Sequence, residues 1–197
     1  MPWQQHAQVV REPAGKIVLA SRSPRRAELL RAAGFEFDVH AVEIDETPRP
    51  GEPAAAYVER LAILKAQAVF ALHRSEMVLG ADTTVVLDGR ILGKPEDRAD
   101  AIAMLTALSG RAHEVLTGVA IVGAAGVQSG VEHTRVWFSP VTDEDIRRYV
   151  DSGQPMDKAG AYGIQGLASR FIPRLEGSYA NVVGLPVTLV SSILSGE

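Results

Sequence analysis

The segment 157–166 combines closely spaced glycines with a single amide side chain, a pattern that could recognise a flat ligand. Gly160, Gly163 and Gly166 recur at every third position, and Gln165 stands among them. Glycines at this density let the backbone approach a bulky group closely. The carboxamide of Gln165 offers one acceptor and two donors at a fixed point, which suits the edge of a nucleobase. A glycine-rich turn between two elements is the alternative interpretation.

A phosphate-binding turn is predicted where a short apolar strand runs into a helix that begins near Pro24. Such a turn leaves free backbone N–H groups that point one way and attract anions. Ser21 and Ser23 add hydroxyl donors, and Arg25 and Arg26 add guanidinium groups that match phosphate oxygens. A solvated helix face is the alternative interpretation of this basic cluster.

Carboxylates supply the candidate catalytic and metal-binding groups. Asp82 interrupts an apolar stretch, and an unpaired buried carboxylate is costly, so Asp82 should meet a cation, a metal ion or solvent at a cleft. Asp45 and Glu46 follow Glu43, and such oxygen ligands suit magnesium or manganese beside phosphate. A strand-end aspartate bonded to nearby N–H groups and a solvated acidic loop are the alternatives.

Two lysines complete the set of candidate charges. Lys65 lies in a predicted helix, and Lys94 lies between Gly93 and Pro95, where the backbone is constrained. Surface charge is the default interpretation of both lysines. The five histidines lie too far apart in the sequence to suggest a local pair of ligands, so they are treated as structural or surface residues.

Composition restricts the class of protein. A chain of 197 residues, 46% of them hydrophobic, fits one large domain or two lobes that share a sheet. The absence of cysteine excludes disulfides, a thiol nucleophile and a zinc–thiolate site, and it is compatible with a reducing cytoplasm. The net charge of −4 argues against a nucleic-acid partner, and no apolar run approaches the roughly 20 residues of a membrane helix.

Hydrophobic periodicity and turn residues predict strands that alternate with helices and then cluster. Helices are expected over 24–33, 53–72, 97–108, from 142 onwards, and over 186–194. Strands are expected over 17–20, 35–42, 77–81, 115–122 and 131–138, with 84–87 as a candidate continuation of 77–81 past a polar break. Asp88 and Gly89 predict a hairpin turn. The pattern favours an α/β protein with a mixed sheet. Residues 1–15 are expected to form a flexible extension before a single domain, 16–197.

The common nucleotide-binding and hydrolase signatures are absent. The sequence contains no Gly-x-x-x-x-Gly-Lys-Ser/Thr loop and no Gly-x-Gly-x-x-Gly after a strand. It also lacks the Gly-x-Ser-x-Gly motif of serine hydrolases with a nucleophile elbow. If phosphates bind to this chain, we therefore expect them at the Ser–Arg turn that precedes the first helix.

Ordered motifs extend over nearly the whole chain, from about residue 17 to residue 194. They are 19–26, 45–46, 80–83, 93–95, 108–110, 157–166 and 183–186. Together they resemble the Maf family of nucleoside triphosphate pyrophosphatases. The resemblance implies an elongated mixed sheet flanked by helices, with two lobes around a central cleft, which is the Maf/ITPase-like fold. It also implies a cytoplasmic house-cleaning enzyme of nucleotide metabolism, in a family that often forms homodimers.

The two main bacterial branches of that family differ at three positions, which here are Arg25, Thr83 and Gln165. The branch that acts on 7-methyl-GTP typically has Trp, Gln and Glu there, so this chain is similar to the branch that acts on dTTP and UTP. Thymine and uracil offer the acceptor O4 beside the donor N3–H, and one carboxamide can form hydrogen bonds with both groups. Arg25 can donate to a pyrimidine carbonyl or hold a phosphate.

The resemblance also implies a mechanism in which water attacks the α-phosphorus of the triphosphate and pyrophosphate leaves. Asp82 would accept the proton of that water or only orient it, and Glu46 and Asp82 would hold a divalent cation, Mg²⁺ or Mn²⁺. Neutralisation of phosphate charge should matter at least as much as the base. The residues expected to bind the phosphates are Ser21, Ser23, Arg26, Lys65 and Lys94.

Other functions stay open at this point. A non-catalytic, nucleotide-binding regulator of cell division would need the pocket but not Asp82. A pyrophosphatase could act on purine or other modified nucleotides instead, and a protein-interaction domain would bind no nucleotide. Among pyrimidines, dTTP, UTP and modified analogues all fit the pattern.

Overall fold

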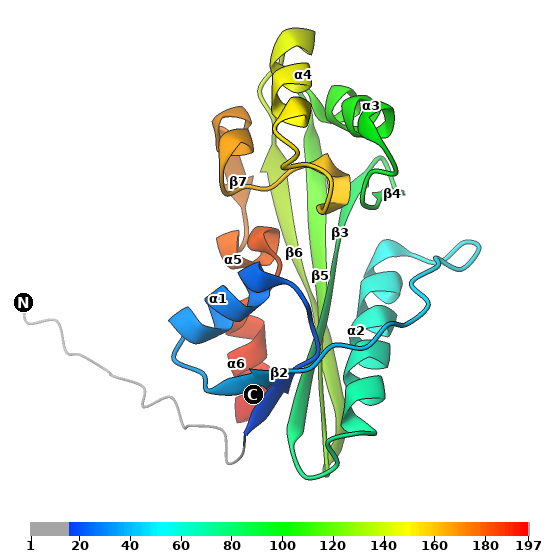
Figure 1. Cartoon of the computed structure of the whole chain (residues 1–197), viewed down its shortest axis with the longest axis vertical. Helices are drawn as coiled ribbons and strands as arrows, with labels where there is room; N and C mark the ends of the chain where they lie inside the picture. Colours follow the sequence, from blue (N-terminus) through cyan, green and yellow to red (C-terminus); the bar gives the residue numbers. More distant parts are fainter. Residues whose placement is uncertain (1–15, 197) are drawn as a thin grey trace, which may run out of the picture.

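The computed structural model describes residues 16–196, so the predicted flexible extension 1–15 lies outside the described residues. Within the described part the strands form one mixed seven-stranded sheet. The strand order is β2 (Phe37–Val39), β1 (Ile17–Leu19), β3 (Met77–Leu87), β5 (Ala112–Gly123), β6 (Gly126–Trp137) and β7 (Arg174–Glu176), and β4 (Arg90–Leu92) pairs with β3. Figure 1 shows that β3, β5 and β6 run along the long axis of the molecule.

Helices flank this sheet on both sides. They are α1 (Pro24–Ala32), α2 (Ala54–Phe70), α3 (Arg98–Leu108), α4 (Asp143–Asp151), α5 (Tyr179–Val183) and α6 (Val187–Ser195), with the 3₁₀ turns η1 (Ala159–Ala161) and η2 (Leu167–Phe171). In Figure 1, α2 lies on one side of the sheet, α1, α5 and α6 lie on the other, and α3 and α4 cover the upper end. The predicted mixed sheet flanked by helices is confirmed. Among the described helices, none is both long enough and apolar enough to cross a membrane.

The sheet combines two modes of pairing. β1 pairs in parallel with β2 and β3, whereas β3, β5, β6 and β7 pair antiparallel. All three residues of β1 are buried, as expected for a parallel strand covered on both faces. The pairing of β1 with its two neighbours fixes the position of its last residue, Leu19, and therefore the starting point of the turn into α1.

Strand β3 continues through its polar residues, contrary to the break predicted there. Asp82 lies opposite Gly118 of β5, and Thr83 lies opposite Thr117. Because the antiparallel ladder with β5 continues without interruption through both residues, their polar side chains do not end the strand. The predicted hairpin after β3 is confirmed, with positive φ angles of 50° at Asp88 and 77° at Gly89.

The second strand is shorter than the predicted range 35–42, since β2 has three residues. The backbone N–H of Phe35 donates to the carbonyl of Leu30 at 3.2 Å, so Phe35 belongs to the turn that ends α1. His40 still donates to the carbonyl of Leu19, but the chain beyond it leaves the sheet. The segment 41–46 therefore leads from β2 toward α2, on the opposite side of the sheet from α1 (Figure 1).

Helix α2 packs directly against the sheet through two glycines. A Cβ atom at Gly80 would lie 2.2 Å from the carbonyl oxygen of Ala62, and one at Gly118 would lie 2.3 Å from that of Val58. These contacts are with backbone, which cannot move aside like a flexible side chain. The two glycines therefore set the distance between α2 and the strands β3 and β5.

Candidate active site

A cleft of about 760 Å³ lies where the β1–α1 turn, α2, the middle of β3 and the segment after α4 meet. A volume of this size is typical of a small-molecule site. The ten residues to which the family resemblance assigns a role all line this cleft. They are Ser21, Ser23, Arg25, Arg26, Glu46, Lys65, Asp82, Thr83, Lys94 and Gln165. Residues from distant parts of the sequence thus converge on one place.

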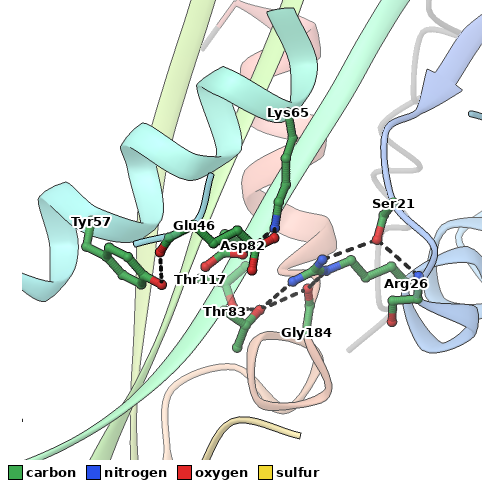
Figure 2. Close-up of polar contacts among 10 residues, drawn as sticks. Ser21, Arg26, Glu46, Tyr57, Lys65, Asp82, Thr83, Thr117 and Gly184 are labelled. Carbon is green, nitrogen blue, oxygen red and sulfur yellow. Dashed lines mark hydrogen bonds and ion pairs between the residues drawn. The ribbon is translucent and has the colours of Figure 1, made fainter. Parts of the chain in front are cut away.

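Lys65 lies between two carboxylates. Its Nζ atom is 2.6 Å from Oδ1 of Asp82 and 2.7 Å from Oε1 of Glu46 (Figure 2). The side chains of Lys65 and Asp82 are only 14% and 11% exposed, whereas that of Glu46 is 49% exposed. The predicted alternative of an aspartate bonded only to backbone groups is therefore wrong, because Asp82 is paired with a buried lysine.

The electrostatic surroundings keep Glu46 ionised. Partial burial by itself would raise the pKa of Glu46, but the hydrogen bond from Lys65 and the positive charges of Lys65, Lys94 and Arg26 lower it below the ordinary value. Lys94 is exposed, and it reaches the cleft from the end of β4. The two carboxylates therefore sit within a group of cations that would also attract phosphate oxygens.

The donor set at this point fits a divalent cation held jointly with a substrate. Glu46 and Asp82 both contact Lys65 Nζ, so their carboxylates share one small space. The described residues contain no group of three or more acidic, histidine or cysteine side chains arranged to hold a metal ion. Mg²⁺ commonly takes one or two carboxylates and completes its octahedron with water and phosphate oxygens. Two carboxylates in one cleft with the predicted phosphate-binding turn meet that requirement.

The loop that carries Glu46 is fastened to α2. The hydroxyl group of Tyr57 donates to the carbonyl of Glu46 at 3.0 Å, and Arg60 donates two bonds of 2.6 Å to Glu52 (Figure 2 shows the first contact). Burial and the charges of the nearby acids raise the pKa of Tyr57 to about 12, so it remains a donor at neutral pH. Asp45, the other member of the predicted acid pair, does not line the cleft and accepts a bond from the backbone of Thr47.

Arg26 uses its guanidinium group within the protein. Nε donates to the carbonyl of Gly184 at 2.8 Å, one terminal nitrogen donates to Ser21 Oγ at 3.2 Å, and the other donates to Thr83 Oγ1 at 3.0 Å (Figure 2). Burial lowers the pKa of Arg26, and the negative charge of Asp82 opposes that effect. The guanidinium plane is therefore fixed beside the carboxylate before any ligand binds.

The serines of the turn have different roles from each other. Ser21 is buried, and its hydroxyl oxygen accepts from the backbone of Ser23 at 3.2 Å as well as from Arg26. Ser23 occupies the N-cap position of α1, as predicted, but its side chain makes no capping hydrogen bond. The predicted anion-binding turn therefore has an internal support in Ser21.

The glycines of the 157–166 segment pack mainly against the protein itself. A Cβ atom at Gly160, where φ is 67°, would lie 2.8 Å from Val85, and one at Gly166, where φ is 83°, would lie 2.9 Å from Gln154. The expectation that these glycines allow a ligand to approach is therefore corrected at both positions. Gln165 is exposed between them and faces the cleft with its neighbours Gly163 and Ile164.

A family model described as "Maf-like protein" matches residues 16–197. The chain belongs to the Maf family. A dTTP/UTP pyrophosphatase of Hahella chejuensis is 55% identical to this Maf chain over 175 residues, which cover 87% of each protein. A dTTP/UTP pyrophosphatase of Aromatoleum aromaticum is 48% identical over 193 residues, covering 91% of this chain and 94% of that one.

The Maf chain is also similar in fold to the Ham1 protein of Staphylococcus aureus. The TM-score is 0.53 at 16% sequence identity, and the match covers 92% of this chain and 98% of the Ham1 chain. At so low an identity the similarity concerns the fold alone.

The structure of this Maf chain adds residues that sequence reasoning missed. Thr117 shares a hydrogen bond of 2.9 Å with Thr83, and Gly184 accepts from Arg26 through its carbonyl. Tyr57 contacts the backbone of Glu46. Thr117 and Tyr57 are common residue types inside periodic apolar stretches, and the carbonyl of Gly184 carries no side-chain signal. Only the motif 183–186, which contains Gly184, indicated that this segment belongs to the site.

Proposed function

We propose that this chain hydrolyses dTTP and UTP to the nucleoside monophosphate and pyrophosphate. The observation that carries the proposal is the arrangement of the cleft, where Asp82 and Lys65 form a buried pair beside Glu46 and the fixed guanidinium of Arg26. The relatives named dTTP/UTP pyrophosphatase, at 48% and 55% identity, support the choice of substrate.

In this proposal the triphosphate lies along the turn that opens α1. The first backbone N–H groups of α1 and the hydroxyl of Ser23 donate to phosphate oxygens, and Arg26, Lys65 and Lys94 neutralise their charge. Three hydrogen bonds already hold the guanidinium group of Arg26, so little side-chain entropy is lost when the substrate binds. The nine-residue helix also presents the positive end of its dipole to the phosphates.

Asp82 is the proposed partner of the attacking water. Its carboxylate is nearly buried and is held by Lys65, so it has a defined orientation. It would accept the proton of the water or orient that water toward the α-phosphorus, and either role fits a carboxylate at this place. Glu46 and Asp82 would hold Mg²⁺ or Mn²⁺, which when bound supplies further neutralisation of the phosphate charge.

Arg25 and Gln165 are the proposed readers of the base. Both line the cleft, from opposite ends of the sequence. The carboxamide of Gln165 can accept from N3–H and donate to O4 of thymine or uracil. Thr83 has a less direct proposed role, because its hydroxyl group supports Arg26. A cytoplasmic location and a homodimer, which the family resemblance implies, stay predictions.

The experiment that tests the proposal measures pyrophosphate release by the purified protein with Mg²⁺ or Mn²⁺. The nucleotides are dTTP, UTP, CTP, GTP and 7-methyl-GTP. We expect dTTP and UTP to have the highest kcat/KM, and we expect Asp82→Asn to lower kcat by about 10²–10⁴-fold because it removes the proton acceptor. Asp151→Asn is the control, since Asp151 forms an ion pair with Arg98 on the surface.

The outcome also distinguishes the alternatives. Near-normal turnover by the Asp82→Asn variant would remove Asp82 from the chemistry. Nucleotide-dependent stabilisation without any pyrophosphate release would favour the non-catalytic regulator. Preference for 7-methyl-GTP or another purine nucleotide would contradict the proposed base recognition.

A further inference from the structure

An ion pair that the proposed chemistry does not use crosses the cleft. Arg25, on α1, donates through a terminal nitrogen to Oδ2 of Asp157 at 3.1 Å, and the two residues are 132 positions apart in the sequence. Both residues line the cleft. The side chain of Arg25 is 26% exposed and that of Asp157 is 62% exposed. The contact therefore joins α1 to the segment that precedes η1.

We propose that Asp157 is a positioning residue that fixes Arg25 relative to Gln165 and thereby helps to set the preference for dTTP and UTP. This inference rests on the proposed function, in which Arg25 and Gln165 read the base. Asp157 acts through Arg25 and touches neither the phosphates nor the attacking water.

The carboxylate of Asp157 is itself held in place. Its second oxygen accepts from Lys158 Nζ, which also donates to the carbonyl of Gln154 at 2.6 Å. The side-chain oxygen of Gln154 accepts in turn from the backbone N–H of Leu167 at 3.2 Å. These bonds attach Asp157 to both sides of Gln165, so Arg25 is oriented against the same segment that carries the amide.

The charge state of Asp157 suits this role. Partial burial by itself would raise its pKa, but the hydrogen bonds and charges of Lys158 and Arg25 lower the pKa below the ordinary value. The carboxylate is therefore ionised at neutral pH and can orient the guanidinium group. A free arginine side chain samples many rotamers, and ordering it before the substrate binds reduces the entropy lost on binding.

The same segment explains why this contact can form. Gly163 lies so close to Lys158 that a Cβ atom there would be 2.9 Å from the lysine side chain. A side chain at position 163 would therefore require the end of the Lys158 side chain to shift from its place beside Asp157. The glycine thus leaves room for the observed arrangement of Lys158, Asp157 and Arg25.

A matched control separates this role from that of an ordinary surface ion pair, which contributes little to stability. Asp151, on α4, pairs with Arg98 at 2.6 Å, and its side chain is 60% exposed, close to the value for Asp157. Asp151 does not line the cleft. Substitution of either aspartate by asparagine removes one exposed charge, but only one of the two substitutions frees Arg25.

The first measurement compares kcat and KM for dTTP, UTP and GTP in the wild type, Asp157→Asn and Asp151→Asn. For Asp157→Asn we expect KM for dTTP and UTP to rise about fivefold, because Arg25 would then have to be ordered when the substrate binds, with a much smaller change in kcat. The ratio of kcat/KM for dTTP or UTP to kcat/KM for GTP should fall by a similar factor. Asp151→Asn should leave KM and the preference unchanged.

The second measurement is a double-mutant cycle on KM with Arg25→Ala, Asp157→Ala and the double variant. If Asp157 acts through Arg25, its substitution has no further effect once Arg25 is absent. Effects that multiply, or an unchanged preference in Asp157→Asn, would overturn the positioning role while leaving the proposed function intact. A wild-type chain that hydrolyses none of these nucleotides would contradict both. Thermal unfolding of each variant confirms that the kinetic comparison is made on folded protein.

Discussion

Lys65 illustrates how one side chain organises the proposed chemistry. It is the shared partner of Asp82 and Glu46, which come from β3 and from the loop before α2. The sequence indicated the residue types and, through the family motifs, their membership of one site. It gave no sign that the lysine lies between the two acids, because the three positions are separated by a helix and a loop. Pairing of that kind depends on tertiary packing.

His113 is a buried residue next to the site that the proposed reaction does not use. Its Nε2 atom shares a hydrogen bond of 2.7 Å with the hydroxyl of Tyr162, which lines the cleft. The ring also packs edge-on against Phe138, at 5.1 Å between centroids. Burial lowers the pKa of His113 to about 4. The histidine is therefore neutral in the folded protein at pH values where an unfolded chain would protonate it.

This difference predicts a pH-dependent free energy of unfolding. The folded-state pKa of His113 is depressed, so the unfolded chain binds the extra proton between pH 6.5 and about 4. Stability that is fully present above pH 6.5 is lost as the pH falls toward 4, by about 3 kcal/mol from this residue. Urea denaturation at a series of pH values measures the loss, and His113→Gln should show a smaller one.

The control for this experiment is His133→Gln, at an exposed position of β6. It should retain the pH dependence of the wild type. If His113→Gln loses stability between pH 6.5 and 4 as steeply as the wild type does, the buried histidine is not the source of the effect.

At the scale of elements, the contact between α2 and the sheet decides where Lys65 and Tyr57 lie. Gly118 of β5 faces the backbone of α2 so closely that a methyl group there would overlap the carbonyl of Val58. The overlap is with main chain, so it can be relieved only by moving the helix or the strand. The position of α2, and with it the position of Lys65, depends on this glycine.

We therefore expect Gly118→Ala to lower the free energy of unfolding by about 3 kcal/mol or more, as overpacking against rigid neighbours does. Chemical denaturation measures the change. Gly123→Ala, at the end of the same strand, is the matched control, because a Cβ atom there would meet only the flexible side chain of Met77, at 3.5 Å. Equal stability of the two variants would show that α2 does not depend on the close approach at Gly118.

Elements were predicted well where the pattern was long and regular. The helix expected over 53–72 is α2, Ala54–Phe70, because its apolar residues recur at steps of three and four. The three-residue strand β7 and the five-residue helix α5 were not predicted. Elements this short have no measurable period, and their pairing with β6 and packing on β5 stabilise them. The break expected in β3 was wrong for the same reason, since β5 pairs across it.

At the scale of the whole molecule, the cleft depends on the length of the sheet. Strands β3, β5 and β6 run along the long axis, with α1, α5 and α6 beside their lower half and α3 and α4 at their upper end (Figure 1). Asp82 lies at the middle of β3, and the β1–α1 turn and the 157–166 segment line the same cleft as Asp82. The sequence predicted the mixed sheet from the order of its elements. The central cleft was predicted from the family resemblance and not from the periodicity of the sequence.

The measurement that tests the central claim most directly is hydrolysis of dTTP in water enriched in oxygen-18. Because the proposed water lies beside Asp82 and attacks the α-phosphorus, the heavy oxygen should appear in thymidine monophosphate and not in pyrophosphate. Mass spectrometry of the two products reads the result. Label in pyrophosphate, or formation of the diphosphate and inorganic phosphate in their place, would contradict the account.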